Sequence, residues 1–563
     1  MTEGFLRFII EVSDYFARIV DNKQSFFGVF IPMIARGIKT VFVTTVLAVC
    51  IFAGSCGEFQ SGSKELRSLG TTIGSLCEVV STDFLEVEGY GIVGGLRGTG
   101  SSECPMRIRE YLRQYILKQM SDRRTNIDGF INSADTAIVR VHGTMSTSVT
   151  ESRYFDVKVT ALPGTQTTSL EDGWLHSTEL KLLGRFGMAT RVFANARGAI
   201  FMDTLNKDTI DRRTGYVLNG GTALGEYPFG LILRNPDFTV ANIIRNRLNS
   251  RFGPNTARAE SAGQIELNVP DKYGKDKQRF ISIVKVMYLV ETEEIVEERI
   301  NTFVDKLAAA KDMNESEIAL EAIGNKSLSK LVDVLNSDNE EVRLRAGRCM
   351  FNLGSDGGLE TLKKIAMDRD SSYRIEALEA ITKGANRNDA SAISRLLLRD
   401  EDVNIRLAAY EQLRILDDIT VKRKPVGRRF YLEQVTQAGD KMIYVTRSGQ
   451  ARIVLFGTPI VCRDNLFIQS ANGEITIDSR PGQNYASVMR KHPKRPTVVG
   501  PLRSTLELID IIETLCEEPV KRSERGRIGL GVSYTDMVAL LKQMHEKGAV
   551  EAPFEAGPLP NIK

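Results

Sequence analysis

The chain has 563 residues, of which 42% are hydrophobic and 26% are charged, an ordinary globular balance with material for roughly three or four domains. Its 74 basic and 71 acidic side chains leave a formal net charge of +3. Because nucleic-acid binding depends on concentrated positive charge that neutralises phosphates, this near balance argues against nucleic acid as a main partner.

Residues 1–56 are interpreted as a leader and signal peptide. The uncharged apolar run Thr40–Ala53 follows Arg36 and Lys39 and is too short for a spanning helix, which needs about 20 residues. A positive start, a short apolar segment and small residues before a cut are typical of a secretory signal. Because Gly-Ser-Cys follows, the run resembles a bacterial lipoprotein signal, so we expect cleavage before Cys56, lipid on its thiol and an outer-membrane anchor. Ordinary signal-peptidase cleavage, which gives an unlipidated exported protein, is the alternative.

A signal that began at Met1 would be unusually long, whereas a segment that begins at Met33 has normal proportions. The sequence therefore predicts that Met33 is the true start, or that residues 1–32 are an unusual leader.

Five cysteines remain once Cys50 leaves with the signal and Cys56 is set aside. Export permits disulfides, and Cys77 with Cys104 is the candidate pair. The chain has four histidines, none in a ligand-like cluster, and no Cys-x-x-Cys motif, so no metal site and no cofactor are expected.

Residues 57–293 form the next predicted part of the chain, and from about Val79 to Tyr288 their pattern is mostly that of strands. Thr136–Gly143 and Tyr154–Leu162 alternate apolar and polar side chains, and Gly263–Pro270 and Arg279–Val290 are interpreted in the same way. Helices are expected from Pro105 to about Met120 and over Asp237–Gly253, which ends in a glycine C-cap. The second helix is expected to bury one apolar face, formed by Val240, Ile243, Ile244, Leu248 and Phe252.

Residues 294–425 are helical and repetitive. Three candidate N-caps recur at spacings of 31 and 32 residues: Asn339, Asp370 and Asp402. Three arginines keep the same spacing: Arg343, Arg374 and Arg406. An apolar helix precedes each unit, so the pattern predicts a solenoid of helix pairs that resembles HEAT repeats, with a further partial unit at Glu315–Ile323.

Strands return over residues 426–563. Lys441–Ile477 is interpreted as a meander with turns at Ser448-Gly449 and Asn472-Gly473. A linker should follow, with a basic loop at Arg490–Arg495 that is either solvated or in contact with an anionic surface. Helices are expected over Thr505–Leu515 and Ser533–Phe554. The whole sequence thus predicts an α+β fold in which β-rich parts are interrupted by an all-α solenoid.

The stretch Glu88–Gly100 contains the spacing Gly-x-Gly-x-x-Gly at Gly89, Gly91 and Gly94. A dinucleotide site needs a helix that starts at the third glycine and points its N-terminus at the pyrophosphate. More glycines and Pro105 follow instead, so these glycines are expected to supply positive φ or close backbone approach at a packed turn. No nucleophile elbow or paired histidine is recognisable, and the chain is not expected to be an enzyme.

The same stretch, "GYGIVGGLRGTG", resembles a signature of the bacterial flagellar P-ring protein family, with Ser101 where that family usually has an aspartate. Four further blocks resemble the family in the same order: Asn132–Leu180, Leu233–Gly253, Ala451–Ile477 and Tyr534–Ala556. The likeness covers about residues 78–293 and 427–555, so the helical repeats look like an insertion into the P-ring fold.

This resemblance implies a structural protein that catalyses no reaction. Such proteins are exported to the periplasm and assemble into a closed ring around the rod of the flagellar basal body, at the peptidoglycan layer. With the L-ring lipoprotein they form a bushing that supports rotation and motility. Candidate contacts with the rod or a neighbouring copy lie in two segments, with packing inside one subunit as the alternative: Gly89, Tyr90, Gly91, Gly95, Gly98 and Gly100, and Arg234, Asn235, Pro236, Asp237 and Phe238.

Two departures from the family leave a second interpretation open. Ordinary P-ring proteins have a signal without the lipid cysteine, and they lack the HEAT-like segment. That segment is expected to bind an unknown protein partner or to form an outward spoke, or else to be a spacer. The alternative function is a lipid-anchored envelope scaffold of P-ring fold that serves no flagellum.

Overall fold

The computed structural model describes residues 70–562 except 81–83, 120–126, 147–152, 184–190, 206–210, 226–228, 428, 437, 493–494 and 519–528. The leader, Met33 and Cys56 therefore lie outside the described residues. The described residues from 72 onward belong to one compact unit.

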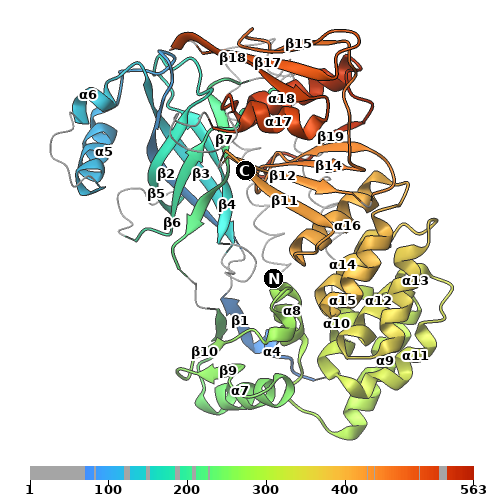
Figure 1. Ribbon diagram of the computed structural model, residues 1–563. Helices are drawn as coiled ribbons and strands as arrows, with labels where there is room; N and C mark the ends of the chain where they lie inside the picture. Colours follow the sequence, from blue (N-terminus) through green and yellow to red (C-terminus); the bar gives the residue numbers. More distant parts are fainter. Residues whose placement is uncertain are drawn as a thin grey trace, which may run out of the picture. The chain divides into compact units, whose positions relative to one another are not determined.

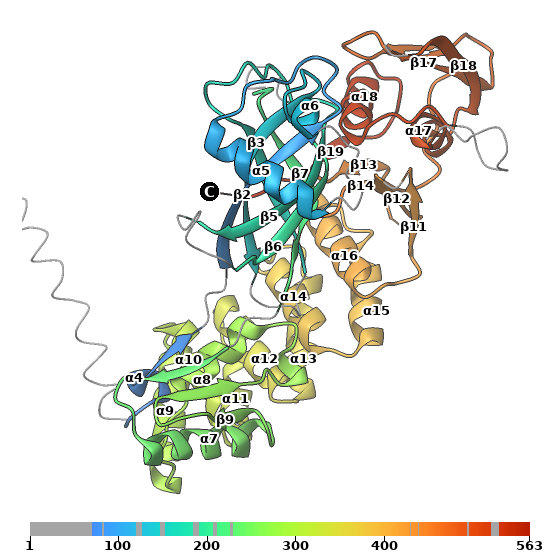
Figure 2. The same cartoon turned by 90° about the vertical axis from the view of Figure 1, so that its left-hand side faces the viewer.

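A closed antiparallel barrel, with strand order β2-β3-β4-β7-β6-β5, follows the first short strand (Figure 1). Its strands are β2 (Phe84–Gly94), β3 (Thr136–Ser146), β4 (Tyr154–Ala161), β5 (Trp174–Leu182), β6 (Ala194–Ala199) and β7 (Thr214–Ala223). Alternate side chains such as Val139 and Val141 fill the barrel, as the sequence alternation predicts. Ile138, which precedes Val139, packs instead with Leu112 and Ile131 beneath the helices α5 (Met106–Gln119) and α6 (Ile127–Ile131), which lie outside the barrel (Figure 2).

A smaller sheet with helices on one face is built from segments on both sides of the barrel. Its strand order is β1 (Cys77–Val80), β8 (Gly230–Leu233), β10 (Gln264–Leu267) and β9 (Ala257–Ala259). The helices α4 (Ile73–Leu76), α7 (Phe238–Phe252) and α8 (Lys277–Val286) and the 3-10 turn η3 (Asp271–Tyr273) accompany it. The predicted α7 is confirmed, with Asp237 as N-cap and Gly253 as C-cap, but Ile243 is 44% exposed and does not belong to its buried face.

The strand predicted over Arg279–Val290 is wrong, because Lys277–Val286 forms α8. Asp276 caps this helix by accepting a hydrogen bond from the Arg279 N–H, and Phe280, Ile283, Val284 and Met287 recur at helical spacing and are buried. Over so short a run, the alternation of Ile281 and Ile283 with polar or smaller neighbours fits the two-residue period of a strand as well as the 3.6-residue period of a helix.

Eight further helices follow as antiparallel neighbours over residues 293–415 of the described chain. They are α9 (Glu293–Ala308), α10 (Met313–Ile323), α11 (Leu328–Val334), α12 (Glu340–Asn352), α13 (Asp356–Met367), α14 (Arg374–Gly384), α15 (Arg387–Leu397) and α16 (Val403–Ile415), with the 3-10 turn η4 (Asn325–Ser327). We call α9–α16 the helical array. The division of the chain at residues 57–293, 294–425 and 426–563 stays a prediction.

Two of the three predicted N-caps of the array are confirmed, because the Asn339 and Asp402 side chains accept N–H groups of α12 and α16. The prediction for Asp370 is wrong. Helix α14 begins later, with Tyr373 as its N-cap, because the Asp368 and Ser371 side chains hold the preceding turn. Two of the repeated arginines donate to turn carbonyls five and six residues back: Arg343 to Ser337 and Asp338, and Arg406 to Asp400 and Glu401.

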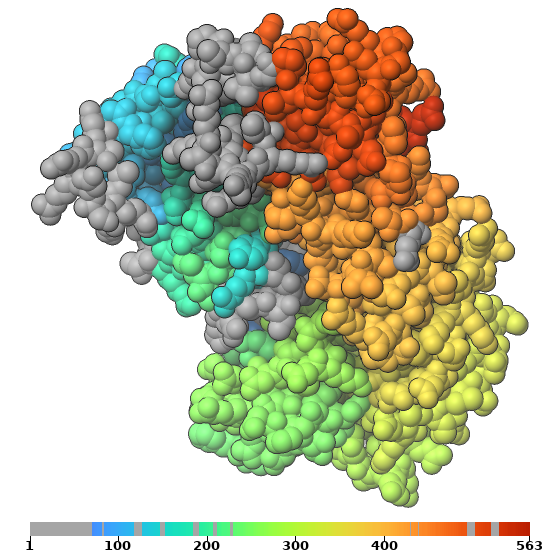
Figure 3. All heavy atoms as spheres, viewed as in Figure 1, coloured from blue at the N-terminus to red at the C-terminus, as the bar shows by residue number. Residues whose placement is uncertain are grey.

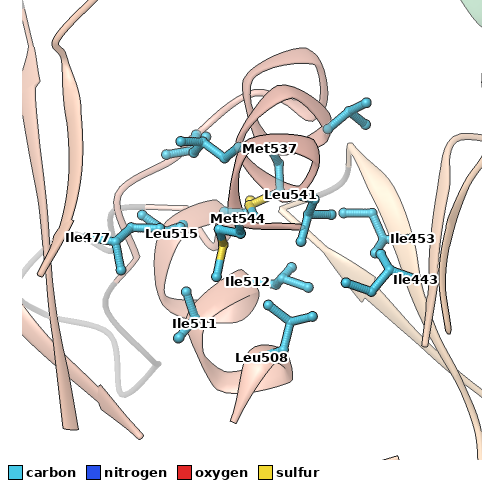
Figure 4. Close-up of a cluster of buried hydrophobic side chains, with 14 of the residues drawn as sticks. Ile443, Ile453, Ile477, Leu508, Ile511, Ile512, Leu515, Met537, Leu541 and Met544 are labelled. Carbon is cyan, nitrogen blue, oxygen red and sulfur yellow. The ribbon is translucent and has the colours of Figure 1, made fainter. Parts of the chain in front are cut away.

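The last part of the chain forms two sheets with two helices between them. One sheet has the order β11 (Val421–Val426), β12 (Phe430–Val435), β14 (Arg452–Phe456), β13 (Met442–Val445), β19 (Phe554–Ala556). The other has the order β15 (Leu466–Gln469), β16 (Ile475–Ser479), β17 (Tyr485–His492), β18 (Arg495–Thr505). The apolar faces of α17 (Leu508–Cys516) and α18 (Tyr534–Glu546) meet each other, with Ile443 and Ile453 on one side and Ile477 on the other (Figure 4).

The single meander predicted over Lys441–Ile477 is therefore wrong, although both predicted hairpin turns exist, at Gly449 and Gly473 with positive φ. The chain leaves the first sheet at Gly457, whose φ is 64°, and starts a second one. The predicted linker is also wrong, because the paired strands β17, which ends at His492, and β18, which begins at Arg495, occupy this part of the chain. Arg490 is only 9% exposed and donates to the Leu530 and Gly531 carbonyls, so it is not part of a solvated loop.

Candidate assembly surfaces

The first predicted contact segment lies within the barrel wall and in the turn that follows it. A Cβ atom on Gly89 would lie 2.2 Å from the Glu179 carbonyl oxygen, and one on Gly91 would lie 2.2 Å from Thr178 Oγ1. A Cβ on Gly100 would lie 2.1 Å from the Thr136 carbonyl oxygen. Gly95 and Gly98 have φ values of 83° and 85°. The expected roles of these glycines, close backbone approach and positive φ, are both confirmed.

The same turn is bound to two other places in the chain. Arg97 lies 3.2 Å from Asp172 and 3.1 Å from Glu474, which belongs to the β15–β16 turn. Ser101 is buried, and its hydroxyl oxygen accepts the N–H groups of Glu103 and Gln166. A hydroxyl thus fills the acceptor role that a short carboxylate could also play there. In the first segment only Gly95 and Gly98 are exposed, and Tyr90 is half-buried.

The second predicted segment is open to solvent along its whole length. Arg234, Asn235, Pro236 and Asp237 are exposed, and Phe238 is 68% exposed. Asp237 accepts the N–H groups of Thr239 at 2.6 Å and Val240 at 3.1 Å, so its carboxylate is needed inside the subunit to start α7. The unexplained feature is Phe238, since a large aromatic side chain at the first turn of a helix gains nothing from water.

Two carboxylates of the barrel part bind the hairpin that contains Gly449, and we call this contact the joint. Asp156 on β4 accepts the N–H of Asn219 and the N–H of Gly449, each at 2.7 Å. Burial raises the pKa of Asp156, and these two hydrogen bonds oppose the rise. Arg447 lies 3.1 Å from Asp203. Sequence reasoning missed this joint because its members lie hundreds of residues apart.

The carboxyl group of Asp536 on α18 also lies close to the barrel, near Asp172. Burial raises its pKa to about 6, and Asp172 of the barrel adds to the rise. Ser533 donates to this carboxylate at 2.8 Å and, with Arg490, opposes the rise. A carboxyl that titrates near pH 6 therefore lies where barrel and C-terminal part meet.

The predicted disulfide between Cys77 and Cys104 is wrong, because both cysteines are free. Cys77 points into the core beneath the small sheet, whereas Cys104 packs near α5 and α6 on the barrel. Burial raises the pKa of Cys77 to about 11, which makes it a poor thiolate.

In the part of the chain that the structure describes, no group of three His, Cys, Asp or Glu residues could hold a metal ion. Every described helix is too short or too polar to span a bilayer. The predicted lipidation site Cys56 lies outside these residues and stays a prediction.

Comparison with known proteins gives a consistent match over the first half of the described chain. The family model of the flagellar P-ring protein matches residues 72–306. The flagellar P-ring protein of Pseudothermotoga lettingae is 27% identical over 212 residues, 35% of this chain and 60% of that protein. The corresponding protein of Bdellovibrio bacteriovorus is 28% identical over 227 residues, 38% of this chain and 64% of that one. The chain thus spans less than two thirds of the length of both relatives.

The matched residues contain the barrel, the small sheet with α7 and α8, and most of α9. The match ends past the predicted start of the insertion at residue 294, and helices α10–α16 and both C-terminal sheets lie outside it. Over residues 72–306 this chain is therefore similar to the flagellar P-ring protein family.

Proposed function

We propose that the chain is a structural subunit of a flagellar P-ring. Copies of it would close into a ring around the rod of the basal body, in the periplasm at the peptidoglycan layer. There, with the L-ring, the ring would support rotation of the rod and so motility. The observation that carries this proposal is that the family match coincides with the barrel and the small sheet.

A ring of copies needs a heterologous interface, in which one patch meets a different patch on the next copy. The segment Arg234–Phe238 is the better of the two predicted candidates, because it is exposed and presents the aromatic ring of Phe238. In the first segment, Gly89, Gly91 and Gly100 are used for packing, so Gly95, Gly98 and the half-buried Tyr90 remain as candidate contacts.

We also propose that the chain catalyses no reaction and binds no nucleotide. The strand β2 runs through Gly89, Gly91 and Gly94, and the next helix, α5, begins only at Met106. A pyrophosphate therefore finds no helix N-terminus at the third glycine. Thermal melting with NAD or ATP should leave the melting temperature unchanged, and a clear upward shift with either would contradict this.

The decisive experiment is to purify hook–basal bodies from the source bacterium. The chain should appear by mass spectrometry in ring stoichiometry, and electron microscopy should place its density around the rod. If intact basal bodies hold a different P-ring protein and this chain stays with the membrane fraction, the assignment fails.

That second outcome would favour the alternative, a lipid-anchored envelope scaffold built on a P-ring fold. The observation behind this alternative is the helical array, most of which lies outside the family match. A genome without rod and hook genes would also support it.

A further inference from the structure

The helical array contacts a segment of the chain that precedes it. This segment, Asp271–Val286, contains η3 and α8 and lies inside the family match. Helices α10, α12 and α14 are the second helices of three successive pairs, and all three contact it. Tyr273 donates to Glu321 on α10 at 3.2 Å, Lys272 to the Asn352 carbonyl on α12, and Lys275 to the Thr382 carbonyl on α14 at 3.3 Å.

The contact is polar and charged, and the charges are complementary. The segment Lys272–Arg279 carries three lysines and one arginine. One ion pair has the opposite polarity: Lys383 on α14 lies 3.2 Å from Asp276 of the segment. An open crevice lined by both partners runs between Lys272, Arg279, Arg348 and Glu376. In the space-filling view the green surface of residues around 270 abuts the yellow surface of the array (Figure 3).

The centre of the contact is a buried ionic cluster on α10. Glu317 and Glu321 are one helical turn apart and have no exposed surface. Arg279 of α8 donates to Glu317 at 2.6 Å and to Glu321 at 2.8 Å. Arg348 of α12 gives Glu317 a second partner at 2.6 Å. Burial alone would raise the pKa of Glu317, but Arg279 and Arg348 outweigh it and hold the pKa below its usual range.

A buried carboxylate needs such partners, because removing one of them leaves an uncompensated charge in a low-dielectric interior. The two glutamates therefore make α10 dependent on Arg279, a residue of the P-ring-like part. In a helix-pair array such a surface would otherwise be open to an outside ligand.

We propose that the surface formed by α10, α12 and α14 of the helical array is a protein-binding surface, and that the basic segment Asp271–Val286 of the same chain occupies it. The array is then an internal brace that holds the P-ring-like residues before it, 72–292, against the sheets that begin at Val421. At this surface the segment Asp271–Val286 takes the place of the outside protein partner that the sequence suggested. The proposal does not rest on the flagellar function, since it concerns contacts within one chain.

Hydrogen exchange on the full-length protein tests the brace. Arg279→Met should speed exchange of the α10 and α12 amides at least tenfold, although the substituted residue belongs to α8. Lys285→Met is the matched control, since Lys285 is an exposed basic residue of the same helix, turned about 120° from Arg279. It should leave α10 and α12 unchanged. A folded Arg279→Met protein whose α10–α14 protection equals that of the wild type would overturn the proposal.

A milder variant decides the matter if Arg279→Met does not fold. Lys383→Glu places a carboxylate beside Asp276, so exchange should rise at least threefold in both α8 and α14. The control Lys364→Glu changes an exposed lysine on α13 and should affect neither. If Lys383→Glu perturbs only α14, the segment is not bound to the array and the proposal fails.

Discussion

The hydroxyl of Tyr410 on α16 donates a hydrogen bond to Glu433 on β12, and neither side chain is exposed to solvent. Arg452 of β14 donates to the same hydroxyl at 2.8 Å, and Arg414 of α16 reaches Glu433 at 3.3 Å. The last helix of the array is thus fixed to the sheet through a buried glutamate. The array is fixed in the same way near its beginning, where Glu317 and Glu321 of α10 meet Arg279 of α8.

Tyr410→Phe should lower the free energy of unfolding by about 2 kcal/mol, because one buried carboxylate oxygen and one guanidinium lose their shared partner. The matched control is Tyr373→Phe, whose hydroxyl lies 3.4 Å from Glu341 at a half-buried site. That loss should stay below about 0.5 kcal/mol, since water can replace the hydroxyl. Urea denaturation of both variants gives the comparison, and equal losses would contradict the role of Tyr410.

Stability should depend on pH through Asp536. Burial first, and Asp172 second, raise its folded-state pKa to about 6, above an unfolded value of about 3.9. Between these values the folded state binds more protons at Asp536, so the contribution of this group to the free energy of unfolding should rise as pH falls from about 7 to about 4. Asp536→Asn keeps an acceptor for Ser533, and it should stabilise the protein at pH 7.5 by about 2 kcal/mol and flatten this part of the profile.

The control for this experiment is Glu546→Gln, which changes an exposed carboxylate on the same helix. Thermal melting between pH 4.5 and 7.5 should give the variant the wild-type profile. An unchanged profile in Asp536→Asn would mean that Asp536 does not titrate in this range.

Gly89→Ala should destabilise the barrel by about 3 kcal/mol, because the added methyl would lie 2.2 Å from a backbone carbonyl that cannot move without breaking strand pairing. Gly225→Ala is the matched control, as a Cβ there meets nothing within 4 Å. It should change stability by less than about 0.5 kcal/mol. Thermal or urea denaturation measures both, and a tolerated Gly89→Ala would show that β2 and β5 can separate locally.

Phe238→Ser tests the proposed assembly surface. The side chain is 68% exposed, so the subunit should keep its stability within about 0.5 kcal/mol. If Phe238 meets a neighbouring copy, swimming motility and the yield of rings on purified basal bodies should fall at least tenfold. Asn246→Ser, a change at an exposed residue of the same helix, should leave both unchanged. Normal rings with Phe238→Ser would move the search to Gly95, Gly98 and Tyr90.

Local signals in the sequence determined much of the fold. The alternation in β3 and β4, the caps Asp237 and Gly253 of α7, and the repeat spacing at Asn339 and Asp402 each act within a few residues. Interactions between residues so close in the sequence can be recognised from the sequence alone, and the α+β class follows from them. The prediction that no helix begins at the third glycine is confirmed, and the resemblance of this stretch to the P-ring family agrees with the match over residues 72–306.

Tertiary structure decided what depends on distant partners. The pattern of Arg279–Val290 fitted strand and helix alike, and packing against α7 and α10 selects the helix. Cys77 and Cys104 were a plausible disulfide pair in the sequence, but the structure places them in two different hydrophobic clusters. The same holds for Glu317 and Glu321, which are ordinary acidic residues in the sequence. They become the centre of the brace because burial makes their charge costly and Arg279, 38 residues away from the nearer one, offsets that cost.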